Sequence, residues 1–149
     1  MLHRGVTFSS SLAVALFARA AFAGAPSCGL EQSRLLIPQG PPGVPVNAAY
    51  GQLVNSSGRN VSIAAFRSPA FGAVELHESF VHNGVASMRE LKSVSIGPRQ
   101  AFELKAGGKH LMLMQPRSRL EAGAKIPLEV VGTDGCISIF EMTVTGKGP

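Results

Sequence analysis

The sequence has little charge, few aromatic residues, no tryptophan and only two cysteines. Charged residues make up 15% of its 149 residues, whereas an average soluble domain has about 25%. Because 45% of the residues are apolar and charge is sparse, intrinsic disorder is excluded. Apolar residues do not recur at heptad spacing, which excludes a coiled coil. The length is that of one domain.

Further absences disfavour two classes of partner. No apolar run after the N-terminal segment approaches 18 residues, so stable membrane insertion is not expected. The net charge is +5, but the sequence contains no dense block of lysine and arginine, so nucleic-acid binding is not expected either.

Motifs of common hydrolases are also missing. The sequence has no Gly-x-Ser-x-Gly elbow and no His-Glu-x-x-His pair. Glu75 and Glu78 are the carboxylates that flank a histidine, His77. We interpret them as solvated groups or as groups beside a metal-binding residue. The sequence therefore predicts a protein that is not an enzyme.

The N-terminal segment, residues 1–23, is predicted to be a cleaved secretory signal peptide. It begins with a short basic region, continues with an uncharged apolar stretch and ends in Ala21-Phe22-Ala23, which favours cleavage before Gly24. Residues 24–149 would then form a single exported domain, with twelve basic and nine acidic groups.

The two cysteines, Cys28 and Cys136, lie near the two ends of the mature chain. Lipidation of Cys28 is disfavoured because no leucine stands three residues before it. An oxidising compartment favours a disulfide, but pairing depends on the distance between the two Cα atoms. A disulfide, two buried thiols and one reactive thiol all remain open.

Short apolar runs alternate with turns rich in Gly, Pro, Asn and Ser. This pattern predicts an all-β sandwich or barrel. The predicted strands are Arg34–Ile37, Ala48–Val54, Val61–Phe66, Ala73–Phe80, Met88–Ile96, Ala101–Leu104, Lys109–Met114, Ile126–Val131 and Cys136–Val144.

Strand alternation places histidine and methionine side chains of two predicted strands on the face opposite the aliphatic residues. In Lys109–Met114, Leu111 and Leu113 share one face, and His110, Met112 and Met114 share the other. In Ala73–Phe80, His77 likewise lies opposite the aliphatic residues. We expect both histidines to face solvent, and we expect Met142 to belong to the core.

Imidazole and thioether groups two residues apart on one strand face lie about 7 Å apart, a distance that suits a shared ion. Thioether sulfur selects Cu(I), with imidazole as a suitable companion. Zn(II) would require cysteine thiolate, a third histidine or a carboxylate, and calcium would require clustered carboxylates. The candidate metal ligands are His77, Met88, His110 and Met112, whereas roles for His82 and Met114 stay open.

The spacing of the four candidates matches a known signature. His77, Met88, His110 and Met112 fit H-x10-M-x21-H-x-M, and the chain thereby resembles the periplasmic copper chaperones of the PCuAC type. Flanking segments are similar to the same family over about residues 33–145. These segments include Leu76-His77-Glu78, Asn83-Gly84-Val85, Met88-Arg89, Leu104–Met114 and Ile126-Pro127-Leu128.

The resemblance implies a cupredoxin-like Greek-key β-sandwich with a surface Cu(I) site. It implies delivery of copper to the copper subunit of cytochrome c oxidase or another exported cuproprotein, often beside a Sco-type thiol protein, and we expect a monomer. Some family members carry a C-terminal tail rich in His and Met that binds Cu(II), whereas this chain ends without such residues, so no second site is expected.

Two alternatives belong to other functional classes. A blue-copper electron-transfer domain needs a cysteine thiolate beside two histidines, and no histidine follows Cys136. If the chain were a metal-independent exported β-sandwich binding module, the spacing of the four candidate ligands would be a coincidence.

Overall fold

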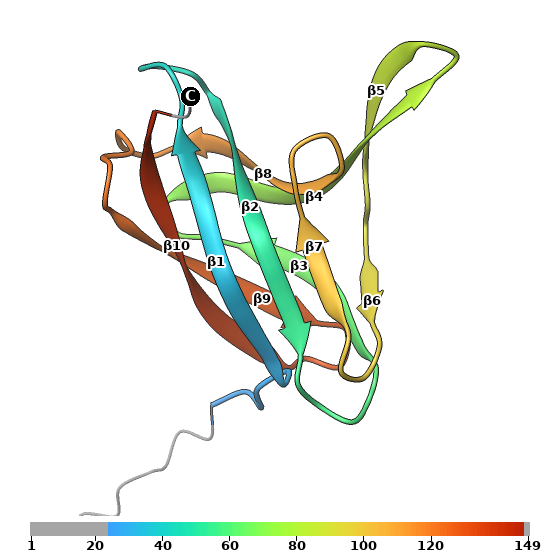
Figure 1. Cartoon of the computed structure of the whole chain (residues 1–149). Coiled ribbons are helices and arrows are strands. Elements are labelled where there is room, and N and C mark those ends of the chain that lie inside the picture. The colour runs from blue at the N-terminus through green and yellow to red at the C-terminus, as the bar shows by residue number, and fades with distance from the viewer. Residues whose placement is uncertain (1–23, 148–149) are drawn as a thin grey trace, which may run out of the picture.

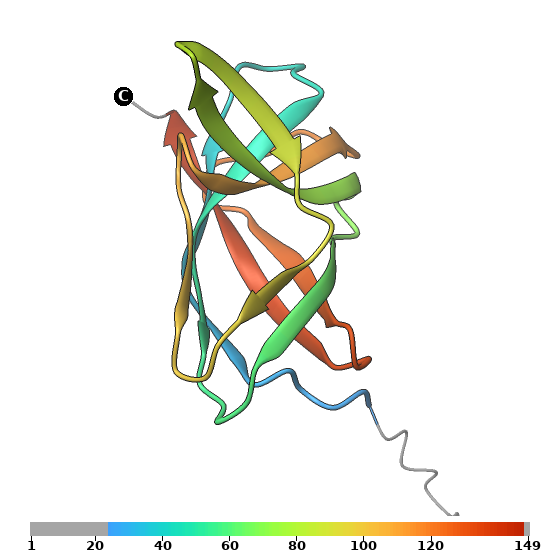
Figure 2. The ribbon, with the colours of Figure 1, turned by 90° about the vertical axis from the view of Figure 1, so that its right-hand side faces the viewer.

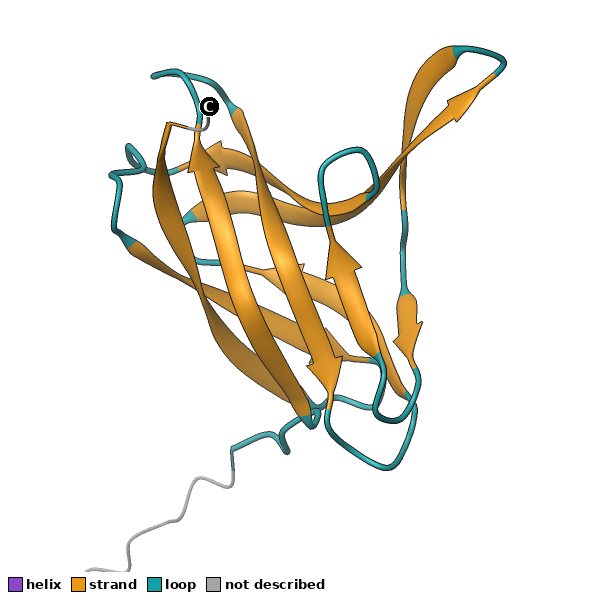
Figure 3. Ribbon diagram, viewed as in Figure 1, coloured by secondary structure: helices purple, strands orange, loops and turns teal. Residues whose placement is uncertain are grey.

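The computed structural model describes residues 24–147, so the predicted signal peptide lies outside the described residues. Within this range the chain forms ten strands and no helix (Figure 3), which confirms the predicted all-β class. None of the described residues belongs to a helix that could cross a membrane. The strands are β1 (Leu30–Gln39), β2 (Val46–Asn55), β3 (Val61–Arg67), β4 (Phe71–His82), β5 (Val85–Glu90), β6 (Val94–Ile96), β7 (Ala101–Leu104), β8 (Lys109–Pro116), β9 (Lys125–Gly132) and β10 (Ile137–Lys147).

One predicted strand is wrong. The run Met88–Ile96 is divided between β5 and β6, whereas each other predicted run falls on a single strand, except that Cys136 lies one residue before β10. The division arises because β5 pairs with β4, and the chain then crosses to pair β6 with β3. The last contact of this segment with β4 is a hydrogen bond from Leu91 N to Leu76 O at 2.8 Å, one residue after the end of β5. The chain then turns away from β4 toward β3.

The strands form one sheet that closes on itself (Figure 1). Their order is β5-β4-β8-β2-β1-β10-β9-β3-β6, and β7 pairs with β2. A bridge between Phe66 of β3 and Val74 of β4 closes a seven-stranded barrel, with β5, β6 and β7 as additional strands. The expected sandwich is therefore a closed barrel in which β3 and β4 join the two sides.

The core fills the barrel with aliphatic side chains from alternate strand positions. Leu111 and Leu113 of β8 are fully buried, and Val74 and Leu76 of β4 are also buried. Met142 is 0% exposed, which confirms its predicted place in the core. Because neighbouring residues on a strand point to opposite faces, the residues between these aliphatic positions lie on the outside of the barrel.

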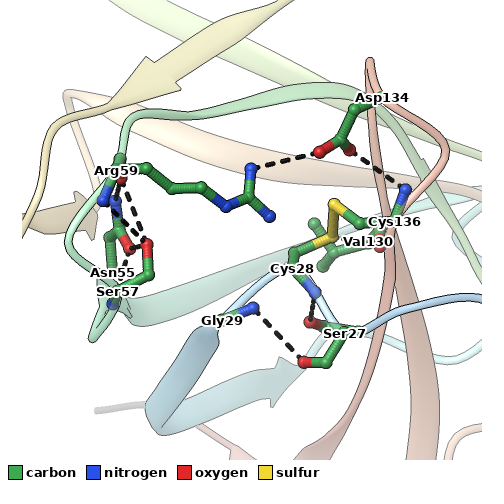
Figure 4. The surroundings of a disulfide bond; sticks show 10 residues. Ser27, Cys28, Gly29, Asn55, Ser57, Arg59, Val130, Asp134 and Cys136 are labelled. Atoms are coloured by element: carbon green, nitrogen blue, oxygen red, sulfur yellow. Dashed lines mark hydrogen bonds and ion pairs between the residues drawn. A yellow bond between two sulfur atoms is a disulfide. The ribbon is translucent and has the colours of Figure 1, made fainter.

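A disulfide joins Cys28 and Cys136 at the end of the barrel where the described chain begins (Figure 4). β1 and β10 pair in parallel, so the segments that precede them start side by side, and the two Cα atoms are 4.9 Å apart. Both cysteines are buried. Of the three states left open by the sequence, the structure shows the disulfide.

The β4–β5 hairpin projects from the barrel beyond the other strands (Figures 1 and 2). Its two-residue turn is Asn83-Gly84, with φ of 49° and 75°. Two central residues with positive φ define the type of turn that matches the twist of hairpin strands, and Asn-Gly is the favoured pair. Every residue from 81 to 90 is exposed, so the hairpin is held by its own pairing and by its base.

Candidate metal centre

Three adjacent strands carry the four predicted ligands. β4 lies between β5 and β8, and both pairings are antiparallel. His77 of β4 lies directly opposite His110 of β8, and their ring centroids are 6.1 Å apart. The structure thus brings together two histidines that are 33 positions apart in the sequence.

The two methionines lie diagonally from His77 on either side. Met88 of β5 is opposite Ser79, and Met112 of β8 is opposite Glu75, each two residues from His77 on β4. Residues paired across strands share a face, and diagonal neighbours about 7–8 Å apart are within reach of long side chains. All four predicted ligands therefore occupy one face of the three strands.

The expectation that both histidines face solvent is wrong in part. His110 is only 6% exposed, and the His77 side chain is 14% exposed. His110 does lie outside the aliphatic core, but Tyr50 of β2 packs beside it with ring centroids 6.3 Å apart, and His77 packs on its other side. Neighbouring aromatic rings, rather than the barrel interior, cover the imidazole.

Exposure rises from the histidines toward the hairpin. Met88 is 51% exposed, whereas Met112 is half-buried. Met88 belongs to β5, which is an edge strand with no partner on its outer side among the described strands. Of the four predicted ligands, Met88 is thus the one most open to an approaching molecule.

His110 is oriented by the backbone. Its Nδ1 lies 3.1 Å from the carbonyl oxygen of Gly108, in the turn that precedes β8. A carbonyl oxygen only accepts, so in the neutral ring Nδ1 carries the hydrogen and Nε2 carries the lone pair. This is the arrangement found around metal-binding histidines, in which the second nitrogen donates to a carbonyl or carboxylate.

His77 is oriented by a carboxylate on its own strand. Its Nε2 lies 2.8 Å from Oε2 of Glu75, while its Nδ1 is buried with no hydrogen-bond partner in the described part of the chain. A buried polar atom without a partner is uncommon and carries a desolvation cost. The sequence indicated Glu75 as a neighbour of a ligand, and its place on the ligand face follows from the two-residue spacing.

The opposite face of the same strands carries an ion-pair cluster. Glu78 of β4 lies 2.7 Å from Arg89 of β5 and 3.1 Å from Lys109 of β8. The Arg89 guanidinium and then the Lys109 ammonium hold the pKa of the Glu78 carboxyl below its ordinary value. Glu78 thereby links the three strands that carry the predicted ligands.

Two other residues lie on or near the ligand face. Glu90 is opposite His77 and forms an ion pair with Lys92. The Glu90 carboxylate raises the pKa of the Lys92 ammonium. Tyr50 is a neighbour of His110 that the sequence did not reveal, because nothing local in the sequence indicates that β2 lies beside β8.

His82 and Met114, whose roles the sequence left open, lie apart from the four predicted ligands. Strand alternation puts His82 on the other face of the hairpin from His77. Met114 lies two residues beyond Met112 on β8 and pairs with Ala73 of β4. Among residues 24–147, no group of three or more His, Cys, Asp or Glu side chains is arranged to hold a metal ion. A cavity of about 530 Å³ lies between the loop at 40–45 and the segment after β8, and none of the four predicted ligands lines it.

Comparison with known proteins shows the family to which the chain belongs. Residues 28–136 match the LpqE-like family, described as "Putative lipoprotein LpqE-like", and the chain is a member of it. It is 32% identical over 127 residues to "Putative lipoprotein Lxx21020" of Leifsonia xyli subsp. xyli (strain CTCB07), covering 85% of this chain and 75% of that protein.

Solved structures connect this family to copper proteins. The solution structure of Cu(I)-DR1885 from Deinococcus radiodurans is similar with a TM-score of 0.61 at 26% identity, covering 86% of this chain and 85% of that one. The copper-bound PCuAC domain from PmoF2 shares the fold with a TM-score of 0.65 at 15% identity, covering 79% and 93%. These matches confirm the resemblance to PCuAC-type proteins that the spacing indicated.

Proposed function

We propose that this chain is a non-enzymatic Cu(I) carrier of the periplasm, and that His77, Met88, His110 and Met112 bind the ion. The observation that carries the proposal is the register, which sets two histidines opposite each other with a methionine diagonal to His77 on each flanking strand. The likeness to a protein solved in its Cu(I) form supports the choice of ion.

The donor set fits Cu(I) chemically. Two imidazoles and two thioethers are all neutral, and thioether sulfur selects Cu(I) among biological metals. The sulfur of the cysteines is unavailable because both form the buried disulfide. Copper is here the cargo, so the ligands must release the ion as well as hold it.

The exposure gradient supports a route for release. His77 and His110 are sheltered, whereas Met88 is half exposed on an edge strand. A ligand of the acceptor enters at Met88 and displaces its thioether, and the histidines give up the ion last. The acceptor that we propose is the copper subunit of cytochrome c oxidase or another exported cuproprotein, reached alone or beside a Sco-type thiol protein.

Export is part of the same proposal. Cleavage before Gly24 leaves a monomeric domain whose two cysteines pair in an oxidising compartment. The family and one relative are described as "Putative lipoprotein", but a lipid thioether at Cys28 needs the sulfur atom that the disulfide uses. Intact-mass measurement of the exported protein is expected to give the mass of residues 24–149 with one disulfide and no lipid.

Anaerobic titration with Cu(I) against a chromogenic Cu(I) chelator tests the copper site. We expect one Cu(I) per wild-type chain and a markedly weaker affinity in His77→Ala and Met112→Leu. His82→Ala is the matched control, because it removes a histidine from the opposite face of the same strand.

Two outcomes would contradict the proposal. Equal affinity in His77→Ala and wild type would remove these residues from the site. Failure of the wild-type chain to retain Cu(I) would favour the metal-independent binding module. Circular dichroism of each variant separates lost binding from lost folding.

A further inference from the structure

Two carboxylates lie on the ligand face next to His77, and they differ in their partners. Glu90 lies opposite His77 but is ion-paired with Lys92. Within the described part of the chain Glu75 forms no ion pair with a lysine or arginine, although it lies near enough to Lys92 to help raise the pKa of that ammonium, and its Oε2 accepts a hydrogen bond from His77 Nε2 at 2.8 Å. Its side chain is 35% exposed beside an imidazole that is 14% exposed. Glu75 is therefore the carboxylate that acts on His77.

The hydrogen bond to Glu75 decides which nitrogen of His77 carries a lone pair. An ionised carboxylate accepts hydrogen bonds and donates none, so Nε2 must carry the hydrogen. In a neutral ring the lone pair then belongs to Nδ1, the atom that is buried without a partner. A cation at Nδ1 would satisfy that lone pair, which no protein group in the described residues does.

Rotation of the ring does not provide an equivalent arrangement. Turning His77 by 180° about its Cβ–Cγ bond places the carbon Cε1 where Nε2 now meets Glu75. The 2.8 Å hydrogen bond would be lost, and the carboxylate would face a C–H group. The hydrogen bond therefore fixes both the orientation and the tautomer of the ring.

The two histidines of the face are fixed in opposite senses. Gly108 O holds the hydrogen on Nδ1 of His110, which leaves Nε2 as its donor atom. Glu75 holds the hydrogen on Nε2 of His77, which leaves Nδ1. Each ring thus has one nitrogen committed to a protein acceptor and one left for an ion.

We propose that Glu75 is a positioning residue that makes Nδ1 of His77 and Nε2 of His110 the two nitrogen ligands of copper. The inference rests on the proposed function, because it specifies the atoms of the same site. Carboxylates that accept from a metal-bound histidine orient the ring and raise its basicity, and their loss costs about 10- to 100-fold in metal affinity.

The tautomer can be measured without copper. Long-range ¹H–¹⁵N NMR spectra of the copper-free chain are expected to show His77 protonated at Nε2. Glu75→Ala should give a mixture of tautomers at His77, whereas Glu75→Gln, whose amide oxygen still accepts, should keep the Nε2–H form. His110 should keep its Nδ1–H form in each variant, because its partner is a backbone carbonyl.

Affinity is measured on the same variants by anaerobic competition. We expect Cu(I) affinity to fall about 10- to 100-fold in Glu75→Ala and to be largely restored in Glu75→Gln. Glu103→Ala is the charge control. Glu103 lies on β7 and pairs with Lys105, so this substitution also removes one negative charge, at a residue with no ion pair to His77. Copper binding should perturb Nδ1 of His77 and leave its Nε2–H signal in place.

The inference is overturned if Glu75→Ala keeps the Nε2–H tautomer and an affinity within twofold of wild type. It is also overturned if Cu(I) removes the Nε2–H signal of His77, since copper would then bind the other nitrogen. A wild-type chain that shows the expected tautomers but no Cu(I) binding would instead overturn the proposed function, and the role of Glu75 toward copper would fall with it.

Discussion

The two ends of the barrel are held together by different means. At the disulfide end, a covalent bond joins Cys28 and Cys136, with Asn55 nearby (Figure 4). The buried amide of Asn55 donates to three backbone carbonyl oxygens at 2.7–3.0 Å. At the hairpin end, every residue from 81 to 90 is exposed, and the three strands are linked by the ion pairs of Glu78.

This difference separates stability from binding. The disulfide end contains buried groups whose removal costs much free energy, and it carries none of the predicted ligands. The hairpin end carries Met88 on an open edge, where a side chain contributes little to the core and can move when a partner ligand arrives. Changes at the disulfide end should therefore lower stability and leave copper binding largely intact. Changes at Met88 should lower copper binding and leave stability largely intact.

Removal of the disulfide should have the largest effect on stability. Cys28→Ala combined with Cys136→Ala opens a loop with a sequence separation of 108, and the chain-entropy relation gives a loss of about 4–5 kcal/mol in the free energy of unfolding. Denaturant titration measures the loss, with reduced wild type as the comparison. Under conditions where the variant is folded, its Cu(I) affinity should match wild type, and a tenfold drop would show that the two ends are coupled.

Asn55→Ala should have the next largest effect. Asn55 is 0% exposed, and its side chain also accepts from Ser57 N and Ser57 Oγ. Its loss leaves buried carbonyl groups without their donor, which is expected to cost about 2–3 kcal/mol of unfolding free energy. Asn60→Ala, at an exposed position on the same loop, is the control and should change stability by less than about 0.5 kcal/mol.

Two methionines allow the separation to be tested with the same substitution. Met88→Leu should change the unfolding free energy by less than about 0.5 kcal/mol, because Met88 is exposed. It should lower Cu(I) affinity at least tenfold, or about 1.4 kcal/mol. Met142→Leu, in the core, should change stability by less than about 1.5 kcal/mol and leave affinity unchanged. Equal affinities for the two variants would exclude Met88 as a ligand.

The smallest expected effect is the acid response of the hairpin end. Because Arg89 and Lys109 lower the pKa of Glu78, its contribution to stability is present above the ordinary value of 4.5 and is lost as the pH falls through the lowered value. Glu78→Gln removes this contribution. Unfolding measured between pH 7 and pH 3 should therefore show a shallower acid decline for Glu78→Gln than for wild type. Identical slopes would show that the cluster does not stabilise the folded state.

Local patterns in the sequence predicted the strands and the faces of their side chains. The alternation in Lys109–Met114 separated Leu111 and Leu113 from His110 and Met112. The structure confirms that Leu111 and Leu113 belong to the core and that Met112 is more exposed, whereas His110 is buried although it lies outside the aliphatic core. The spacing of His and Met indicated the PCuAC-type resemblance before any strand was paired. Such inferences succeed because alternation has a period of two residues and depends on nothing beyond the strand itself.

Only the tertiary structure decided which strands became neighbours and what covered each side chain. The parallel pairing of β1 with β10 places Cys28 beside Cys136, and Tyr50 shelters His110 because β2 lies beside β8. The run Met88–Ile96 splits because its two halves pair with different strands. Pairing and register join residues far apart in sequence and depend on closure of the whole barrel, so a local pattern could not specify them.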